Sequence, residues 1–296
     1  MSDLLSLELK RIAHEIDSRF DALLVPPDDS RRSLYEAMRH AAIGGGKRLR
    51  PLLVSGAARL FAVDEECALR AGLAVECIHV YSLIHDDLPA MDDDDMRRGK
   101  PTVHKAFDEA TAILAGDGFQ ALAFEILADD DTHQDPFVRA ELVLALAGAS
   151  GLGGMVGGQA MDMAAAVTMQ DLANVTRLQQ LKTGALIAFS VEAGAILGRL
   201  PVEGRTRLRA YAHDLGLAFQ IADDLLDAEG DAAKIGKAVR KDEAAGKATF
   251  VSLLGLDRAR AQAQSLSDQA IGHLANFGRE ADLLRDIAAY TVKRDR

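Results

Sequence analysis

The sequence contains no tryptophan, few aromatic residues and only two cysteines. Aromatic residues occupy 5% of its 296 positions, and runs of β-branched residues are few, whereas alanine and leucine are abundant. Because alanine and leucine favour helix, this balance predicts an α-helical protein rather than one built on a β-sheet. Cys67 and Cys77 form no CxxC arrangement, so we interpret them as small apolar side chains in a reducing compartment.

A basic surface and an export signal are lacking as well. The chain has 34 basic and 45 acidic residues, which gives a formal net charge of −11. Nucleic acids need a basic face, so we expect no nucleic acid partner, although a small phosphorylated ligand needs only a few nearby cations. The first residues, MSDLLSLELKRIAHEID, are charged throughout and do not resemble a signal peptide. These features predict a soluble, cytoplasmic protein.

One stretch, residues 142–161, is uncharged over about the length of a membrane helix. It is crowded with glycine, and its hydrophobic content is modest for a membrane span. We interpret it as a buried helix that lets its neighbours come close, and we expect no membrane span.

Apolar residues at helical spacing predict many helices and no strand. We expect helices at about residues 3–24, 30–43, 49–61, 65–88, 104–114, 117–128, 136–161, 168–197, 203–227 and 249–292. Asp29 or Ser30 is expected to cap the second helix and Asp64 the fourth, while Thr168 and Asp171 resemble a capping box. No linker divides the chain, so we predict a single all-α domain over residues 1–296, with a deep interior.

Two clusters of aspartates stand at the ends of apolar helical runs. The first, HDDLPAMDDDDMRRGKP at 85–101, has six aspartates within ten positions, and the second is ADDLLD at 222–227. Two carboxylates about 4 Å apart repel by roughly 1 kcal/mol in water and by about 4 kcal/mol at a protein surface. Either the first cluster is a solvated loop or it binds a cation. The second cluster favours metal ions that share a polyphosphate between the two.

The spacing within each cluster indicates which aspartates share a site. Asp223 and Asp227 are one helical turn apart on one face, with Asp224 at its edge. Asp86 and Asp92 are too far apart for one face of a straight helix, but Pro89 ends the helix and lets the next turn fold back. The residues at 93–95 are then expected to be solvated or to support the site.

Basic residues could hold the phosphates. The run at 44–50, GGGKRLR, places backbone N–H groups and cations before a helix, which is typical of an anion site. His79 lies two turns before Asp86 on the same face. Lys182, within an apolar helix, needs a counter-charge, either a bound phosphate or an aspartate. Lys237 and Lys247 follow the second cluster.

Seven motifs occur in a specific order. They are GGGKRLRP, SLIHDDLPAMDDDDMRRGKPT, AILAGDG, GGQAMD, LKTGALI, FQIADDLLD and GKAT. From about residue 30 to the C-terminus the chain therefore resembles the trans-isoprenyl diphosphate synthases (the polyprenyl synthetase family). It is most similar to the bacterial members that make farnesyl diphosphate. The resemblance implies long, mostly antiparallel helices around a deep central cavity, and a homodimer.

The resemblance also implies a reaction: isopentenyl diphosphate condenses with dimethylallyl and then geranyl diphosphate to give farnesyl diphosphate. Three Mg2+ ions, with Mn2+ as an alternative, would help the allylic diphosphate ionise to an allylic cation. The implied metal ligands are Asp86, Asp87, Asp92, Asp223 and Asp227. The implied allylic diphosphate ligands are Arg97, Lys182, Thr183, Gln220, Lys237 and Lys247, of which Lys182, Thr183 and Gln220 would be catalytic. The implied isopentenyl diphosphate ligands are Lys47, Arg50, His79 and Arg98.

Product length is expected to depend on the floor of the cavity, which the resemblance places at Ser82 and Tyr81. The bulk of Tyr81 and the inserted Pro89–Ala90 are typical of the bacterial farnesyl type and predict a fifteen-carbon product. A geranylgeranyl diphosphate synthase is the first alternative, and Tyr81 argues against it. A class I terpene cyclase would lack the second cation set, Lys47, Arg50 and Arg98. A non-catalytic partner subunit would have degraded aspartate motifs, and both motifs are intact here.

Overall fold

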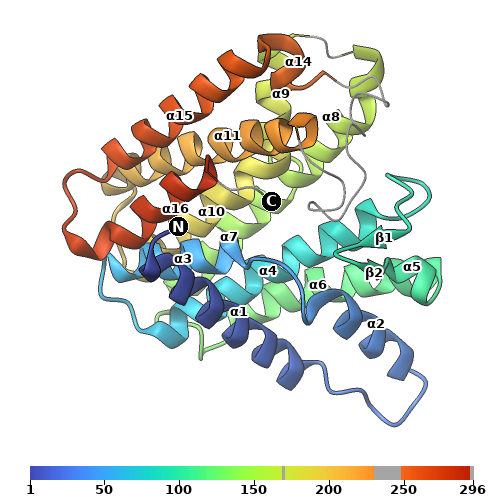
Figure 1. The fold of residues 1–296 in the computed structure, drawn as a ribbon. Coiled ribbons are helices and arrows are strands. Elements are labelled where there is room, and N and C mark those ends of the chain that lie inside the picture. Colours follow the sequence, from blue (N-terminus) through green and yellow to red (C-terminus); the bar gives the residue numbers. More distant parts are fainter. Residues whose placement is uncertain (169–170, 230–247, 294–296) are drawn as a thin grey trace.

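The computed structural model describes residues 1–168, 171–229 and 248–293, and these are almost entirely helical (Figure 1). The all-α prediction is therefore confirmed. The α-helices are α1 (Asp3–Leu23), α2 (Arg32–Ala42), α3 (Leu49–Arg59), α4 (Glu65–Asp86), α5 (Val103–Ala106), α6 (Glu109–Ala128), α7 (Pro136–Ser150), α8 (Met155–Thr168), α9 (Leu172–Gln179), α10 (Ala185–Leu197), α11 (Thr206–Glu229), α14 (Phe250–Leu254), α15 (Leu256–His273) and α16 (Asp282–Thr291). Three short turns of other helix types are η1 (Gln180–Gly184), η2 (Val202–Arg205) and η3 (Arg279–Ala281).

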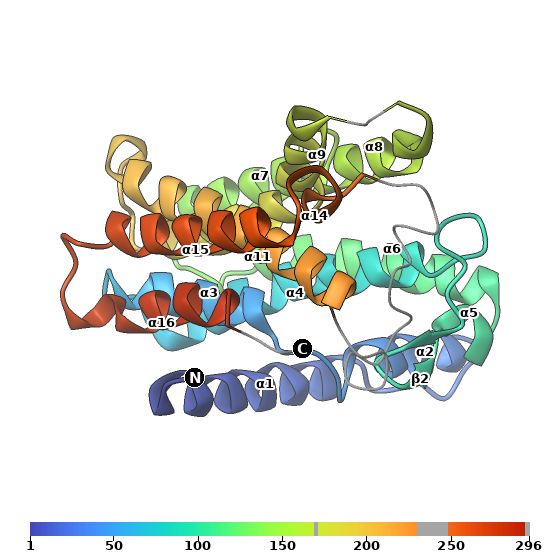
Figure 2. The same cartoon turned by 45° about the horizontal axis from the view of Figure 1, so that its top comes forward.

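The helices pack around α4, which is apolar on nearly all sides. It contacts α6 along one side and α3 along the other, α10 packs on α3, and α11 packs on α15. In Figure 2, α1 runs along the lower edge of the molecule, α7, α8 and α9 lie at the upper edge, and α15 runs between the two edges. Most buried apolar side chains form one cluster, and a smaller cluster joins α9, α11, α14 and α15. The prediction of one domain over residues 1–296 stays a prediction.

The predicted caps are correct at some helices and wrong at others. Asp64 accepts a hydrogen bond of 2.8 Å from the backbone N–H of Glu66 and caps α4, as predicted. At α2 the cap position is Arg31, and Asp29 binds the N–H of that residue in the preceding turn. The predicted capping box at 168–171 is wrong, because α8 continues to Thr168 and Asp171 alone caps α9.

Several predicted helix boundaries need correction. The glycine-rich helix breaks at residues 151–154, where a Cβ on Gly154 would lie 2.0 Å from the carbonyl oxygen of Ala149. The predicted helices at 104–114 and 117–128 are instead the short α5 and the continuous α6. The long helix expected at 168–197 contains the π-helical turn η1, and residues 249–292 form three α-helices. The expectation of no strand is also wrong, because two strands of two residues each, β1 (Met96–Arg97) and β2 (Lys100–Pro101), form an antiparallel hairpin.

Among the described residues, three helical segments are long and apolar enough to cross a membrane by length and composition: Glu65–Asp86, Glu109–Ala128 and Pro136–Ala164. The first is 72% buried inside the protein, but the other two are only 39% and 28% buried. The sequence had drawn attention only to part of the third segment. The prediction that the protein has no membrane span stays a prediction.

Candidate active site

Two adjoining cavities lie beside the C-terminal half of α4. The larger has a volume of about 670 Å³, and Asp86, Lys182 and Thr183 contribute to a wall that is otherwise mostly apolar. The smaller, about 320 Å³, is lined by Lys47, Arg48, Arg50 and Arg98 among others. Both are lined by Arg50 and His79, so the two cavities meet at these side chains. The fold therefore places an apolar pocket next to a basic one.

The turn after α4 brings Asp86 and Asp92 together, as the break at Pro89 predicted. The backbone N–H of Asp92 donates a hydrogen bond of 2.9 Å to the carbonyl oxygen of Asp86. Burial raises the pKa of the Asp86 carboxyl to about 6, and Asp92 adds to the rise while Lys182 opposes it. This carboxylate is thus held where negative charge is unfavourable unless a cation is present.

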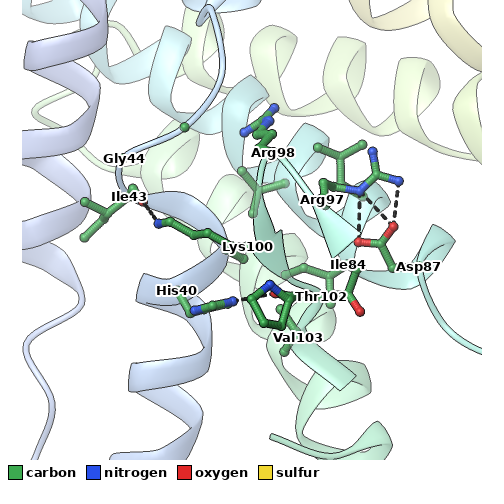
Figure 3. A pocket seen from close by; sticks show the side chains of 15 residues that line it. His40, Ile43, Gly44, Ile84, Asp87, Arg97, Arg98, Lys100, Thr102 and Val103 are labelled. Carbon is green, nitrogen blue, oxygen red and sulfur yellow. Dashed lines mark hydrogen bonds and ion pairs between the residues drawn. The ribbon is translucent and has the colours of Figure 1, made fainter. Parts of the chain in front are cut away.

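Asp87 faces a different cavity from Asp86. Its carboxylate accepts bonds from Nε of Arg97 at 2.8 and 2.9 Å, and the Nη2 atom lies 2.6 Å from Oδ1 (Figure 3). The pair lines a third, small cavity of about 40 Å³ together with Arg98 and Lys100. Burial raises the pKa of Asp87, although Arg97 opposes the rise. Of the two adjacent aspartates, Asp86 lines the large cavity and Asp87 the small third one.

Lys182 finds its counter-charge in Asp162, one of the two options that the sequence left open. Its Nζ atom lies 2.7 Å from Oδ2 of Asp162, a residue that the list of site residues had missed although GGQAMD was recognised as a motif. Burial lowers the pKa of Lys182, but Asp162 and Asp86 outweigh burial and raise it. Lys182 belongs to η1, and a Cβ on Gly158 of α8 would lie 2.2 Å from its backbone nitrogen. Gly158 therefore allows α8 and η1 to approach closely.

A chain of hydrogen bonds links Thr183 to the second aspartate cluster. The Thr183 hydroxyl donates to Oε1 of Gln220 at 3.3 Å, and the Gln220 amide donates to Asp224 at 3.2 Å. The other oxygen of Asp224 accepts the backbone N–H of Phe250 at 2.8 Å. Asp224 is buried and orients Gln220, which leaves Asp223 and Asp227, one turn apart on α11, as the half-buried carboxylates of this cluster.

The smaller cavity is basic because four cations surround it. Burial and the charge of Arg98 lower the pKa of Arg50, whereas the charge of Glu76 opposes this change. The Nε atom of Arg50 is buried and has no hydrogen-bond partner in the part of the chain that the structure describes. Burial and the charges of Arg50 and Arg98 also lower the pKa of His79 well below its usual value. A Cβ on Gly46 would lie 2.8 Å from the guanidinium of Arg98, so the glycine loop allows that side chain to lie against the backbone. An anion would relieve this concentration of positive charge.

The structure places some of the remaining predicted residues but not all of them. Tyr81 and Ser82 both line the large cavity, as predicted for its floor. Lys237 and Lys247 lie outside the described residues. The sequence also missed Gln159 in the wall of the large cavity, whose two side-chain polar atoms are buried and have no hydrogen-bond partner among the described residues. It missed Tyr290 as well, whose ring lies 6.0 Å from Nζ of Lys47.

The carboxylates of the large cavity fit Mg2+, which prefers oxygen ligands. Within residues 1–168, 171–229 and 248–293, no group of three or more ligating side chains is close enough together to hold a metal ion. Mg2+ is commonly bound by one or two carboxylates together with substrate phosphates. Asp86 in the wall of the large cavity and Asp92 beside it therefore suit an ion that arrives with a diphosphate. Asp223 and Asp227 lie outside this wall on α11, where the charge of Asp223 acts on Arg50.

Residues 31–287 match the family model described as polyprenyl synthetase. This chain belongs to the polyprenyl synthetase family. It is 42% identical to the farnesyl diphosphate synthase of Escherichia coli, with 98% of each chain covered, and 43% identical to that of Bacillus subtilis, with 89% of each covered. Geranylgeranyl pyrophosphate synthases of Arabidopsis thaliana also match, at 39–42% identity.

Solved structures of family members share the fold. An FPP/GFPP synthase from Zymomonas mobilis is 60% identical, with a TM-score of 0.91 over 99% of this chain and all of that one. A geranyltransferase from Helicobacter pylori, solved with magnesium and isoprenyl diphosphate, is 31% identical, with a TM-score of 0.81 over 99% of this chain and 97% of that one. The family, the fold and the prenyltransferase activity predicted from the sequence are confirmed by these relatives.

Proposed function

We propose that this polyprenyl synthetase is a farnesyl diphosphate synthase that joins isopentenyl diphosphate to dimethylallyl and then geranyl diphosphate. The observation that carries the proposal is the pair of cavities that meet at Arg50 and His79. The large cavity suits an allylic diphosphate, since its apolar wall can take the hydrocarbon and Asp86 and Lys182 lie at the polar end. The basic cavity suits the diphosphate of isopentenyl diphosphate. Two substrates would thus meet at the junction.

The residues around the large cavity suit ionisation of the allylic substrate. Bound Mg2+, in a number that we propose to be three, would neutralise charge on the leaving diphosphate. Lys182 lines this cavity and would add positive charge to the same group, as Lys237 and Lys247 would from outside the described residues. Arg97 would have to leave Asp87 to do so. The Thr183–Gln220 pair, oriented by Asp224, places oxygen dipoles beside the carbon that becomes positive. The apolar wall keeps water from the cation. Attack by the double bond of isopentenyl diphosphate is followed by loss of a proton to the departing diphosphate.

Product length is the finer point of the proposal. One similar structure is described as an FPP/GFPP synthase, and some relatives are geranylgeranyl pyrophosphate synthases. Tyr81 lines the large cavity, and the residues one turn further along α4, such as Cys77 and Ile78, are fully buried in the core. We therefore propose that Tyr81 limits the depth of the cavity on its face of α4, although His79 also lines the cavity. Tyr81→Ala should give products longer than fifteen carbons, and unchanged product length would show that Tyr81 is not the floor.

We also propose a homodimer, formed through α6 and α7. Both helices carry large apolar side chains that are exposed in the single chain, at 55–83%: Leu114, Phe137 and Leu144. Exposed large apolar side chains on two helices in contact are typical of an interface between subunits. Light scattering after size exclusion should give twice the chain mass of 31.7 kDa. A monomer that sediments with phospholipid vesicles would instead indicate a membrane surface.

The activity test uses the whole protein with Mg2+, isopentenyl diphosphate and dimethylallyl diphosphate. The alcohols released by phosphatase are then separated by chromatography, and we expect farnesol as the main product. A twenty-carbon alcohol would favour the geranylgeranyl alternative. A hydrocarbon formed from an allylic diphosphate without isopentenyl diphosphate would favour a cyclase. No elongation in any combination would contradict the proposal.

A further inference from the structure

His85 packs against Tyr81 in the wall of the large cavity. The two residues are one helical turn apart on α4, and both line the cavity. Their rings meet edge to face, with centroids 5.1 Å apart and planes at 90°. This is a favoured geometry for an aromatic pair, so the His85 ring limits where the Tyr81 ring can turn.

The His85 ring is itself held against the backbone of α6. Its Nε2 atom lies 3.1 Å from the carbonyl oxygen of Ile113. A Cβ built on Gly116 would lie 2.1 Å from Nε2 and 2.4 Å from Cδ2 of His85, and its three nearest atoms all belong to this ring. The absence of a side chain at Gly116 therefore creates the space that the ring occupies.

Packing matters for Tyr81 because its side chain lacks another anchor. Tyr81 is only 9% exposed, and in the part of the chain that the structure describes its hydroxyl forms no hydrogen bond. Its ring position then depends on the side chains around it, and His85, which lies against α6, is one of them. A tyrosine that turned toward α6 would open the cavity beyond its present end.

We infer that His85, docked on Gly116, is a positioning residue for Tyr81 and thereby helps to determine product length. This inference rests on the proposed function. The limit would be set by a unit of three residues, in which Gly116 makes room for His85 and His85 supports Tyr81. Of the three residues, Tyr81 is the one whose side chain would face the growing hydrocarbon.

The first test is the product ratio of His85→Ala. We expect the ratio of twenty-carbon to fifteen-carbon product to rise about tenfold, because the aromatic contact that holds Tyr81 is lost. The ratio is compared at equal consumption of isopentenyl diphosphate, so that a change in overall rate caused by a substitution next to Asp86 does not affect the readout. The side chain of His85→Gln can still reach the Ile113 carbonyl but lacks the ring, so this variant should shift the ratio too. It serves as a second variant in case His85→Ala folds poorly.

The second test is a double-mutant cycle with Gly116→Ala. This change should displace the His85 ring and shift the ratio in the same direction. Combined with His85→Ala it should add nothing, because the atoms that it would meet are gone. Gly118→Ala on the same helix is the matched control, since its Cβ would meet only the flexible Met38 side chain at 3.3 Å.

The outcomes separate the two levels of the argument. Wild-type protein that makes no prenyl diphosphate would overturn the proposed function itself. A wild-type enzyme that makes farnesyl diphosphate, with folded His85→Ala and His85→Gln variants of unchanged product ratio, would overturn only the role of His85. Equal shifts from Gly116→Ala with and without His85 would overturn the docking that links α6 to Tyr81.

Discussion

The two cavities share Arg50 and His79 but otherwise contain different chemistry. The carboxylate of the large cavity, Asp86, has its pKa raised by burial and has Asp92 as a neighbour. The carboxylate in the lining of the small cavity, Glu76, is paired with Arg48 at 2.8 Å. One cavity therefore carries carboxylates that need cations, and the other carries cations that need an anion.

This difference indicates how one fold can distinguish two diphosphates. In the large cavity the diphosphate must arrive with metal ions, because carboxylates and phosphates repel each other. In the small cavity Lys47, Arg50 and Arg98 suit a diphosphate directly. Only the diphosphate that binds metal ions would then act as a leaving group. Mutations that affect one cavity, the other or both test this division.

The largest effect is expected for Asp86→Asn. The variant should lose at least about a thousandfold in kcat, because the carboxylate that we propose as a metal ligand, and so as a support for the leaving charge, is gone. Binding of isopentenyl diphosphate, measured by calorimetry without Mg2+, should stay unchanged. Asp93→Asn, at an exposed position in the following turn, is the matched control and should stay near wild type. Weakened binding in Asp86→Asn would mean that the cavities are not independent.

Arg50→Met is expected to come next, because this side chain lines both cavities. Loss of a buried charged partner should weaken binding of both diphosphates, by about a hundredfold in kcat/KM for each. Separate titrations of the two substrates measure this. An effect on only one substrate would assign Arg50 to a single cavity.

Much of this arrangement could be predicted from the sequence, because local chemistry decides it. The break at Pro89 correctly predicted that Asp92 folds back to Asp86. The cost of a buried lysine correctly required a counter-charge for Lys182. Asp64 was recognised as a cap from its position before an apolar helix.

The rest depends on contacts between distant segments. The local sequence does not predict that Arg97 pairs with Asp87. Nor does it predict that Asp224 orients Gln220 and accepts a hydrogen bond from the backbone N–H of Phe250, 26 residues away in sequence. The break after α7 was missed because glycines within an apolar run fit a close-packed helix as well as a turn. Which glycine is a close contact, such as Gly116 under His85, follows only from the packed helices.

A smaller effect is expected for Lys47→Met, which changes only the basic cavity. Lys47 is exposed at the cavity edge, so loss of one charged contact should raise KM for isopentenyl diphosphate by about tenfold. The KM for the allylic substrate should not change. Lys10→Met, on α1 and outside the cavity lining, serves as the control. Equal effects on both substrates would contradict the division between the cavities.

The smallest effect is a gain in stability from removing the charge of Asp86. Its folded-state pKa of about 6 exceeds the ordinary value of 3.8, so folding favours the protonated form. The resulting stabilisation is complete below about pH 4 and is lost as pH rises through about 6. Asp86→Asn stays neutral, so without Mg2+ its free energy of unfolding should exceed that of wild type by about 1–2 kcal/mol at about pH 8, allowing for partial exposure. Urea unfolding should show this gain and its disappearance at about pH 4, whereas an equal gain at both pH values would indicate improved packing instead of relief of charge.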